Sequence, residues 1–110
     1  MSATPVNLVI EKGTTFEASF YLTGDDGQML NLNSSNCYGY IKKYPTSPTK
    51  HEFVVGINTS DGEINISMGS SQTSQLYSGR NYFDVFLNNT EFNFISRVVT
   101  GTIIVEETTL

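Results

Sequence analysis

The stretch Ser70–Leu87 constrains the fold of this 110-residue chain more than any other part of the sequence. Its first half, up to Tyr77, is rich in hydroxyl side chains that favour the start of a helix, so it predicts one short helical turn. Gly79 follows, and a glycine at this place ends such a turn in the left-handed conformation. Arg80–Leu87 is dense in aromatic and β-branched residues and predicts a strand. This order of turn, glycine and apolar strand is typical of the late strands of a β-sandwich.

Alternation of apolar and polar residues predicts further strands on both sides of this stretch. The clearest alternation runs from Thr14 to Leu22, where Phe16 and its alternate neighbours share one face. The other expected strands span residues 6–11, 36–43, 51–57, 63–68 and, at the end, Phe92 or Phe94 to Val105. About seven strands at regular spacing, with one helical turn, predict an antiparallel β-sandwich that forms a single domain over residues 1–110.

Turn-forming residues separate the expected strands. Gly24–Gly27 and Asn88–Glu91 are expected to be turns, and Asp61-Gly62 gives the best hairpin signal in the chain. Tyr44–Lys50 contains prolines at positions 45 and 48, which cannot share a ladder of hydrogen bonds, so it is expected to form a loop. Met29–Leu32 is a short apolar segment that we expect to cover one end of the core.

Two interpretations of the strand after Gly79 disagree on which face is buried. Leu76, Gly79 and Tyr82 have the spacing of a tyrosine corner, which would turn Tyr82 inward. Aliphatic content favours the opposite face, and we adopt that interpretation. It buries Phe83, Val85 and Leu87 and turns Tyr82, Asp84 and Phe86 outward. A bulge near Arg80 would reconcile the two interpretations.

Charge and composition exclude several classes of partner. The net charge is −5, and a chain this acidic repels a phosphate backbone unless it carries a basic patch. Lys42, Lys43 and Lys50 form the largest basic group, which is too small, so we expect no nucleic-acid partner. No apolar run approaches the roughly 20 residues that cross a bilayer, and no signal peptide is visible at the start. We therefore expect no membrane contact and synthesis in a cytoplasm.

Residues that could carry chemistry are few. The single cysteine, Cys37, cannot form an intramolecular disulfide and is expected to be a small thiol in the core. His51, the single histidine, is expected to be a surface residue of a strand. The acidic turns Asp25-Asp26 and Asp61–Glu63 have fewer oxygen ligands than a calcium-binding loop requires. We therefore expect no metal, no cofactor and no enzymatic activity.

Aromatic residues outside the expected core are the candidates for a binding surface. Tyr38, Tyr40 and Tyr44 form a stripe that leads into the proline-containing loop. This stripe is either ordinary strand surface or a platform for a sugar or a partner protein. Tyr82 and Phe86 are expected either to form a subunit contact or to lie beneath a loop.

Two charged residues are expected to meet across the final hairpin. Asp84 lies on the apolar strand and Arg97 on the last one, so a four-residue turn would bring them face to face. An exposed ion pair of this kind contributes roughly 0.2–1 kcal/mol and would fix the register of the hairpin. Asp84, Arg97 and Gly79 are the residues to which the sequence assigns a structural role.

Several short motifs follow one another in a fixed order. They are Gly13-Thr14-Thr15-Phe16, Gln72-Thr73 with Leu76 and Gly79, Asp84-Val85, and Arg97-Val98-Val99 with Gly101. This order resembles small virion structural proteins of tailed bacteriophages, above all the short Ig-like β-sandwich proteins of T-even-like myophages, including those that infect cyanobacteria. The resemblance extends from about Val6 to Val105. The chain departs from that family at Tyr40–Lys43, which replaces an arginine-containing strand, and in its added aromatic residues Tyr82 and Phe86.

This resemblance implies a non-enzymatic, Ig-like β-sandwich that works by docking onto other virion proteins. It implies a place in the tail, in the baseplate or as capsid decoration, and further copies of the same chain are among the expected partners. It also implies assembly in the host cytoplasm, presence in the virion and no catalytic residues. The alternative is a carbohydrate-binding or host-attachment module in which Tyr38, Tyr40 and Tyr44 stack on sugar rings.

Overall fold

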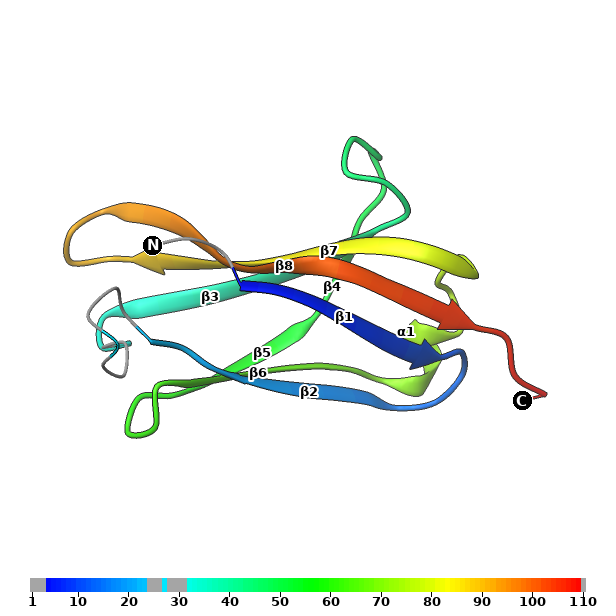
Figure 1. The fold of residues 1–110 in the computed structure, drawn as a ribbon, viewed down its shortest axis with the longest axis horizontal. Helices are drawn as coiled ribbons and strands as arrows, with labels where there is room; N and C mark the ends of the chain where they lie inside the picture. The colour runs from blue at the N-terminus through cyan, green and yellow to red at the C-terminus, as the bar shows by residue number, and fades with distance from the viewer. Residues whose placement is uncertain (1–3, 24–26, 28–31, 110) are drawn as a thin grey trace.

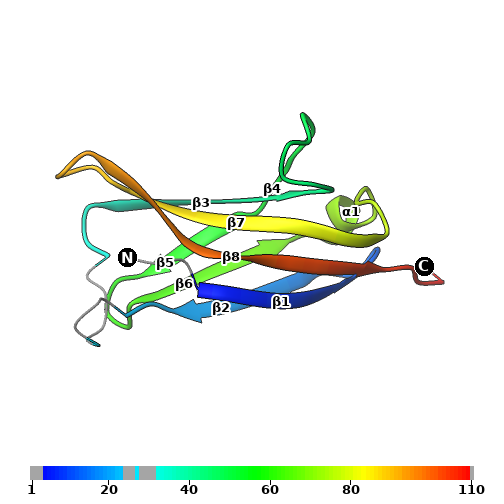
Figure 2. The ribbon, with the colours of Figure 1, turned by 45° about the horizontal axis from the view of Figure 1, so that its top comes forward.

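A computed structural model describes residues 4–23, 27 and 32–109. Two β-sheets form the layers of a sandwich with the hydrophobic core between them (Figures 1 and 2). The strands are β1 (Thr4–Glu11), β2 (Phe16–Tyr21), β3 (Ser35–Lys42), β4 (His51–Glu52), β5 (Val54–Asn58), β6 (Glu63–Met68), β7 (Gly79–Asn89) and β8 (Phe94–Glu106), and one helical turn, α1 (Ser70–Thr73), joins β6 to β7. The all-β sandwich with a helical turn before the penultimate strand is confirmed.

The division of strands between the layers is that of an Ig-like sandwich. One sheet has the order β1-β8-β7-β3-β4, and the other has the order β2-β6-β5. An Ig-like topology assigns these places to β2, β3, β5, β6, β7 and β8. Each sheet turns one face to the core and the other to solvent.

The first strand departs from the antiparallel arrangement that the sequence predicts. β1 pairs in parallel with β8, from Thr4 opposite Val99 to Glu11 opposite Glu106, whereas the other strand pairs among the described residues are antiparallel. Alternation of side chains shows which face of a strand is buried, but it does not show which strand lies beside it. Gly101 permits this pairing, because a β-carbon at that position would overlap the carbonyl oxygen of Val6.

The apolar run expected to be one strand at 51–57 changes sheet at Phe53. β4 pairs with β3 in the larger sheet, and β5 pairs with β6 in the smaller one. The backbone N–H of Phe53 donates to the carbonyl oxygen of Gly39 at 2.9 Å. The Phe53 ring enters the core between Phe16 and Phe83, at centroid distances of 6.0 and 6.4 Å. The run looks continuous in sequence because a residue at a crossing between layers is buried like a strand residue.

The outward and inward faces of β7 follow the interpretation based on aliphatic content. Phe83, Val85 and Leu87 are buried, and Tyr82, Asp84 and Phe86 are half-buried on the opposite face. The bulge lies in β8 and not near Arg80: the pairing passes from Val85 opposite Val99 to Phe86 opposite Arg97. The extra residue, Val98, lets two consecutive valines enter the core, where both are buried.

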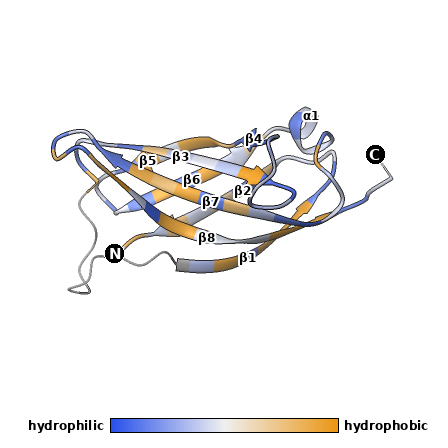
Figure 3. Ribbon diagram, turned by 90° about the horizontal axis from the view of Figure 1, so that it is seen from above, coloured by the Kyte–Doolittle hydropathy of each residue, from blue (hydrophilic) through white to orange (hydrophobic). Residues whose placement is uncertain are grey.

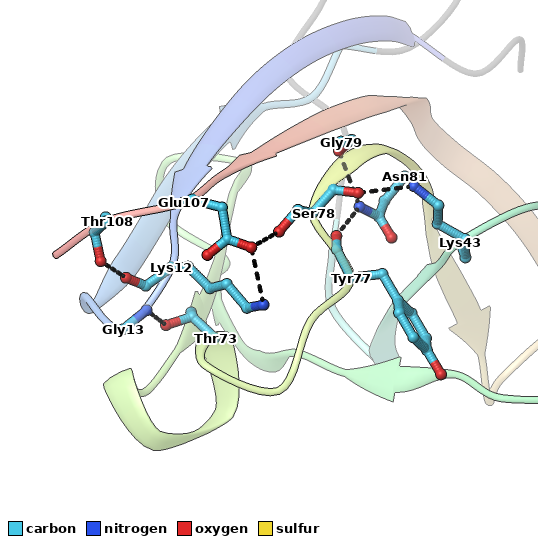
Figure 4. A network of polar contacts seen from close by, with 10 residues as sticks. All are labelled: Lys12, Gly13, Lys43, Thr73, Tyr77, Ser78, Gly79, Asn81, Glu107 and Thr108. Atoms are coloured by element: carbon cyan, nitrogen blue, oxygen red, sulfur yellow. Dashed lines mark hydrogen bonds and ion pairs between the residues drawn. The ribbon is translucent and has the colours of Figure 1, made fainter. Parts of the chain in front are cut away.

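Asn81 occupies the inward place that the tyrosine-corner interpretation, which we did not adopt, would give to Tyr82. Its side chain is 2% exposed, and its amide nitrogen donates to the carbonyl oxygens of Tyr77 and Gly79 at 2.8 and 3.1 Å (Figure 4). A tyrosine corner likewise ties a strand to the backbone just before it. Here the side-chain amide of Asn81, at the inward-facing position next to Tyr82, makes the equivalent hydrogen bonds. Tyr82 therefore lies on the outer face.

The helical turn is shorter than expected. α1 ends at Thr73, and its N-terminal cap is Gly69, whose N–H donates to the side-chain oxygen of Gln72 at 3.2 Å; no hydroxyl side chain caps it. Gly79 adopts the expected left-handed conformation, with φ +94°, but as the first residue of β7. It therefore redirects the chain into the strand and does not end the helix.

The other turns are partly as expected. Gly62, with φ +63°, closes the hairpin between β5 and β6 as predicted. The final turn spans residues 90–93, two residues later than the predicted Asn88–Glu91, because β7 continues to Asn89. Residues 24–26 of the turn expected at Gly24–Gly27 and residues 29–31 of the segment expected at Met29–Leu32 lie outside the described residues. Leu32 itself is buried in the core.

Replacing Gly101 by alanine tests the close approach of β8 to β1. Because the new β-carbon would overlap the backbone of Val6, the strands must move apart, and we expect the free energy of unfolding to fall by about 1–3 kcal/mol in urea denaturation. Gly56→Ala in β5 is the matched control, since its nearest neighbour would be the Asn65 side chain at 4.0 Å. Equal stability of the two variants would contradict this account of the parallel pair.

Replacing Asn81 by alanine tests its role at the start of β7. The change removes two hydrogen bonds and leaves two carbonyl groups without their partner, so we expect a loss of roughly 1–3 kcal/mol in the free energy of unfolding. Asn36→Ala, on the exposed face of β3, should stay within about 0.5 kcal/mol of the wild type. A loss at Asn81 no larger than at Asn36 would show that the amide does not hold the turn.

Candidate functional site

The outer face of the five-stranded sheet joins two groups of aromatic residues that the sequence left separate. In the register of β3 and β7, Tyr38 is opposite Phe86 and Lys42 is opposite Tyr82. Between these pairs, Tyr40 is opposite Asp84. Cross-strand partners share a face, so the tyrosines of β3 and the outward residues of β7 form one surface. Figure 3 looks onto this sheet and shows hydrophobic and hydrophilic segments alternating along its strands.

A pocket of about 120 Å³ lies on this surface, and we call it the aromatic pocket. It is lined by Tyr40, Lys42, Pro45, Lys50, Tyr82, Phe83, Asp84 and Phe86. β3 and β7 form its floor, and the loop between β3 and β4 stands up beside it (Figures 1 and 2). Pockets for small-molecule ligands usually measure roughly 300–1,000 Å³. The aromatic pocket is therefore the size of a site for one side chain.

Lysines hold the loop against the floor of the pocket. The Lys50 ammonium nitrogen lies 4.1 Å from the centroid of the Tyr40 ring, within the range of a cation–π interaction. The Lys42 ammonium group donates to the carbonyl oxygen of Pro45 at 3.5 Å. These contacts order the wall of the pocket and place two positive charges on its rim.

The expected contact between Asp84 and Arg97 is present. Arg97 Nη1 lies 3.5 Å from Asp84 Oδ1, and the Thr100 hydroxyl donates to the same oxygen at 2.6 Å. The two charged residues are not directly opposite, because Asp84 pairs with Thr100 and Arg97 pairs with Phe86. The bulge in β8 and the later turn produce this diagonal arrangement. The Asp84 carboxylate thus already contacts Arg97 and Thr100 of its own chain. The positive charges of Lys42 and Lys50 on the rim of the pocket therefore remain available to a partner.

The tyrosine stripe is not one continuous platform. Tyr40 is half-buried in the pocket with Lys50 over its ring, whereas Tyr38 lies one pair further along the sheet. Tyr44 follows the end of β3, is 52% exposed and does not line the pocket. The structure thus brings Tyr40 together with Tyr82 and Phe86, and it separates Tyr40 from Tyr44.

A second apolar surface lies at the end of the β7–β8 hairpin, and the sequence analysis did not identify it. Phe92, Phe94 and Ile95 are 70%, 50% and 67% exposed. We call these three residues with Glu91 the hairpin tip. The sequence does contain a signal for this exposed surface. Bulky apolar residues follow the polar turn at consecutive positions, but a strand turns only one of its two faces to the core, so some of them must be exposed. The sequence analysis treated Phe92 and Phe94 only as the start of a strand and therefore did not identify this surface.

Polar contacts at the opposite end tie the termini of β1 and β8 to the segment around α1 (Figure 4). Lys12 Nζ lies 3.6 Å from Glu107 Oε1, and the Ser78 hydroxyl donates to the same carboxylate. The hydroxyl of Ser78 and then the charge of Lys12 lower the pKa of Glu107. These contacts join the ends of β1 and β8 to the loop before β7.

The described residues contain neither a group of metal ligands nor a helix able to span a membrane. Within residues 4–23, 27 and 32–109, no group of three or more histidine, cysteine or acidic residues could hold a metal ion. The acidic turn predicted at Asp25-Asp26 lies outside this part of the chain. No helix in the described ranges has the length and apolar character needed to cross a membrane.

Cys37 and His51 are both partly buried strand residues. Cys37 packs against the core from β3, on the inward face that also holds Ile41. His51 is half-buried in the short strand β4. Burial raises the pKa of the Cys37 thiol to about 11, which keeps it protonated near neutral pH. This is the behaviour of a structural thiol and not of a nucleophile.

No protein-family model matches the chain, and no curated protein matches it.

The pKa of Cys37 gives a prediction for chemical labelling. Since it is raised from 9.0 to about 11, the thiolate fraction at pH 8 is about 100-fold smaller than for an ordinary thiol, and iodoacetamide should react correspondingly slowly with the folded protein. The rate should rise as the pH approaches 11. The control is the same protein in urea, where labelling should be fast at pH 8. Fast labelling of the folded protein at pH 8 would contradict the burial of Cys37.

Proposed function

We propose that this chain is a non-enzymatic structural protein of a bacteriophage particle, which docks onto other virion proteins through the outer face of its five-stranded sheet. The observation that carries the docking face is the aromatic pocket, where Tyr40, Tyr82 and Phe86 converge. Aromatic residues that line a pocket are typical of the anchor points of protein interfaces. The proposed place in a phage particle rests on the resemblance of the sequence motifs to phage virion proteins.

The composition of the pocket supports a protein partner over a sugar. Stacking on sugar rings needs exposed, coplanar aromatic rings, but one face of Tyr40 is taken by Lys50. Tyr38 and Tyr44 lie apart from the pocket floor. A pocket of about 120 Å³ instead admits one side chain of a neighbouring protein.

The rigidity of the face also supports a docking role. The pocket stands on two strands that are paired along eight residues, from Ser35 opposite Asn89 to Lys42 opposite Tyr82. Its wall is held by Lys42 and Lys50. A surface ordered before binding loses little conformational entropy when a partner docks, which favours affinity. In a particle, many copies of such a contact add avidity.

The proposal is tested by incorporation into particles. A phage that lacks the gene is grown in hosts that supply the wild type, the double variant Tyr82→Ser/Phe86→Ser or the control Tyr21→Ser, and copies per purified particle are counted by mass spectrometry. Tyr21 is the control because it is 69% exposed on the other sheet. Loss of each anchor should weaken docking by about 30-fold or more, so the double variant should be nearly absent from particles.

Two outcomes would contradict the proposal. Absence of the wild-type protein from purified particles would remove the virion role. Binding to a glycan array that is lost in Tyr38→Ala and Tyr44→Ala would favour the carbohydrate-binding alternative. Urea denaturation of each variant is the accompanying control, since a misfolded protein would also be missing from particles.

A further inference from the structure

The hairpin tip is held in an ordered and projecting form. The side-chain oxygen of Asn89 accepts hydrogen bonds from the backbone N–H groups of Glu91 and Phe92, at 3.0 and 2.8 Å. The backbone N–H and the hydroxyl of Thr90 donate to the carbonyl oxygen of Ser34, at 2.8 and 2.9 Å. The turn is therefore fixed on both sides, and Phe92 remains 70% exposed at its end. A fixed apolar side chain of this kind is suited to insertion into a pocket on another molecule.

The aromatic pocket matches the ring of Phe92 in size and character. Its volume is about 120 Å³. An apolar cavity of about 150 Å³ is enough to hold benzene. The aromatic pocket is smaller than that cavity but open to solvent, so a phenyl ring enters it in part, beside Tyr40, Tyr82 and Phe86. Rings that enter such a site gain stacking or edge-to-face contacts in addition to apolar burial.

The charges beside the two features are complementary. Glu91 precedes Phe92 and is exposed. Lys42 and Lys50 line the pocket, and the nearby carboxylate of Asp84 already contacts Arg97 and Thr100. The chain as a whole carries a net charge of −5, so the positive rim is a local exception to an acidic protein. A tip with the sequence Glu91-Phe92 fits a pocket with lysines on its rim.

The tip cannot reach the pocket of its own chain. Along β7, Asn89 at the base of the tip lies about 10 Å from Phe86 at the near edge of the pocket and about 17 Å from Asp84 further in. The tip points away from the loop that forms the pocket wall, toward the opposite end of the molecule (Figure 1). The two features therefore meet only between different copies of the chain.

We propose that the hairpin tip of one copy occupies the aromatic pocket of a second copy, with Phe92 in the pocket and Glu91 against Lys42 and Lys50. This contact joins two different surfaces, so each copy keeps a free pocket and a free tip after the first contact forms. Such a head-to-tail contact gives a ring if the rotation closes and a filament if it does not. The inference rests on the proposed function, because it names the partner at the same docking face.

Mixing of two defective variants tests the contact directly. Sedimentation velocity of the wild type should show association that increases with concentration. Phe92→Ser, which lacks the tip, and Lys42→Glu/Lys50→Glu, which lacks the basic rim, should each associate about 30-fold more weakly or not at all. A mixture of the two should form a 1:1 dimer that grows no further, because only one intact tip and one intact pocket remain in each pair.

Charge reversal provides a second test. Adding Glu91→Lys to the Lys42→Glu/Lys50→Glu variant should strengthen its association again, since opposite charges face each other, but not to the wild-type level, because the variant lacks the lysine contacts that hold the pocket wall. Tyr21→Ser, which removes an equally exposed aromatic residue from the other sheet, should associate like the wild type. These residues lie at the surface, and urea denaturation checks that each variant is folded.

The outcomes separate this inference from the proposed function. A wild type that stays monomeric up to about 1 mM, or association that survives Phe92→Ser, would overturn the contact between copies. So would a mixture of the two variants that does not dimerise. If the contact fails while Tyr82→Ser/Phe86→Ser is still excluded from particles, docking onto a different virion protein stands. If copies of the chain associate as proposed but purified particles lack the protein, the virion role is contradicted and the contact between copies stands.

Discussion

The packing of Phe53 between Phe16 and Phe83 is the interaction on which the rest of the structure depends. These three rings come from the crossing between the sheets, from β2 and from β7, so they join both layers at one point. Gly39 leaves the space for the ring, since a β-carbon there would lie 3.1 Å from Phe53 Cδ2. With this crossing fixed, the chain leaves β3 by the loop of residues 43–50 and returns through β4. The pocket wall is therefore a consequence of how the core is closed.

The register of β7 connects the core to the aromatic pocket. Each residue that β7 buries sets the position of its neighbour on the outer face, so Phe83, Val85 and Leu87 in the core place Tyr82 and Phe86 in the pocket. The bulge at Val98 then shifts β8 by one residue, which sets the diagonal contact of Arg97 with Asp84. Core packing, the aromatic pocket and the charge on its rim thus depend on one strand alignment.

Much of the fold could be predicted, because local patterns carry it. Alternation located most strands within a few residues, and Gly62 and Gly79 have the positive φ angles expected of them. The errors have a common cause. The sheet change at Phe53, the parallel partner of β1 and the position of the bulge all depend on which segments meet in space, and side-chain alternation carries no such information. Tyr82 was ambiguous for the same reason, since spacing alone does not show that Asn81 takes the inward position.

The sequence alone determined the class of fold, most of the buried faces and the individual aromatic candidates. Those properties follow from composition and from a period of two along each strand. Only the tertiary structure decided that Tyr40, Tyr82 and Phe86 share a pocket, that Tyr44 lies outside it and that Phe92 projects from a hairpin. The physical reason is that a site is formed by cross-strand neighbours, and neighbours are set by sheet order and register, which arise when the two layers pack.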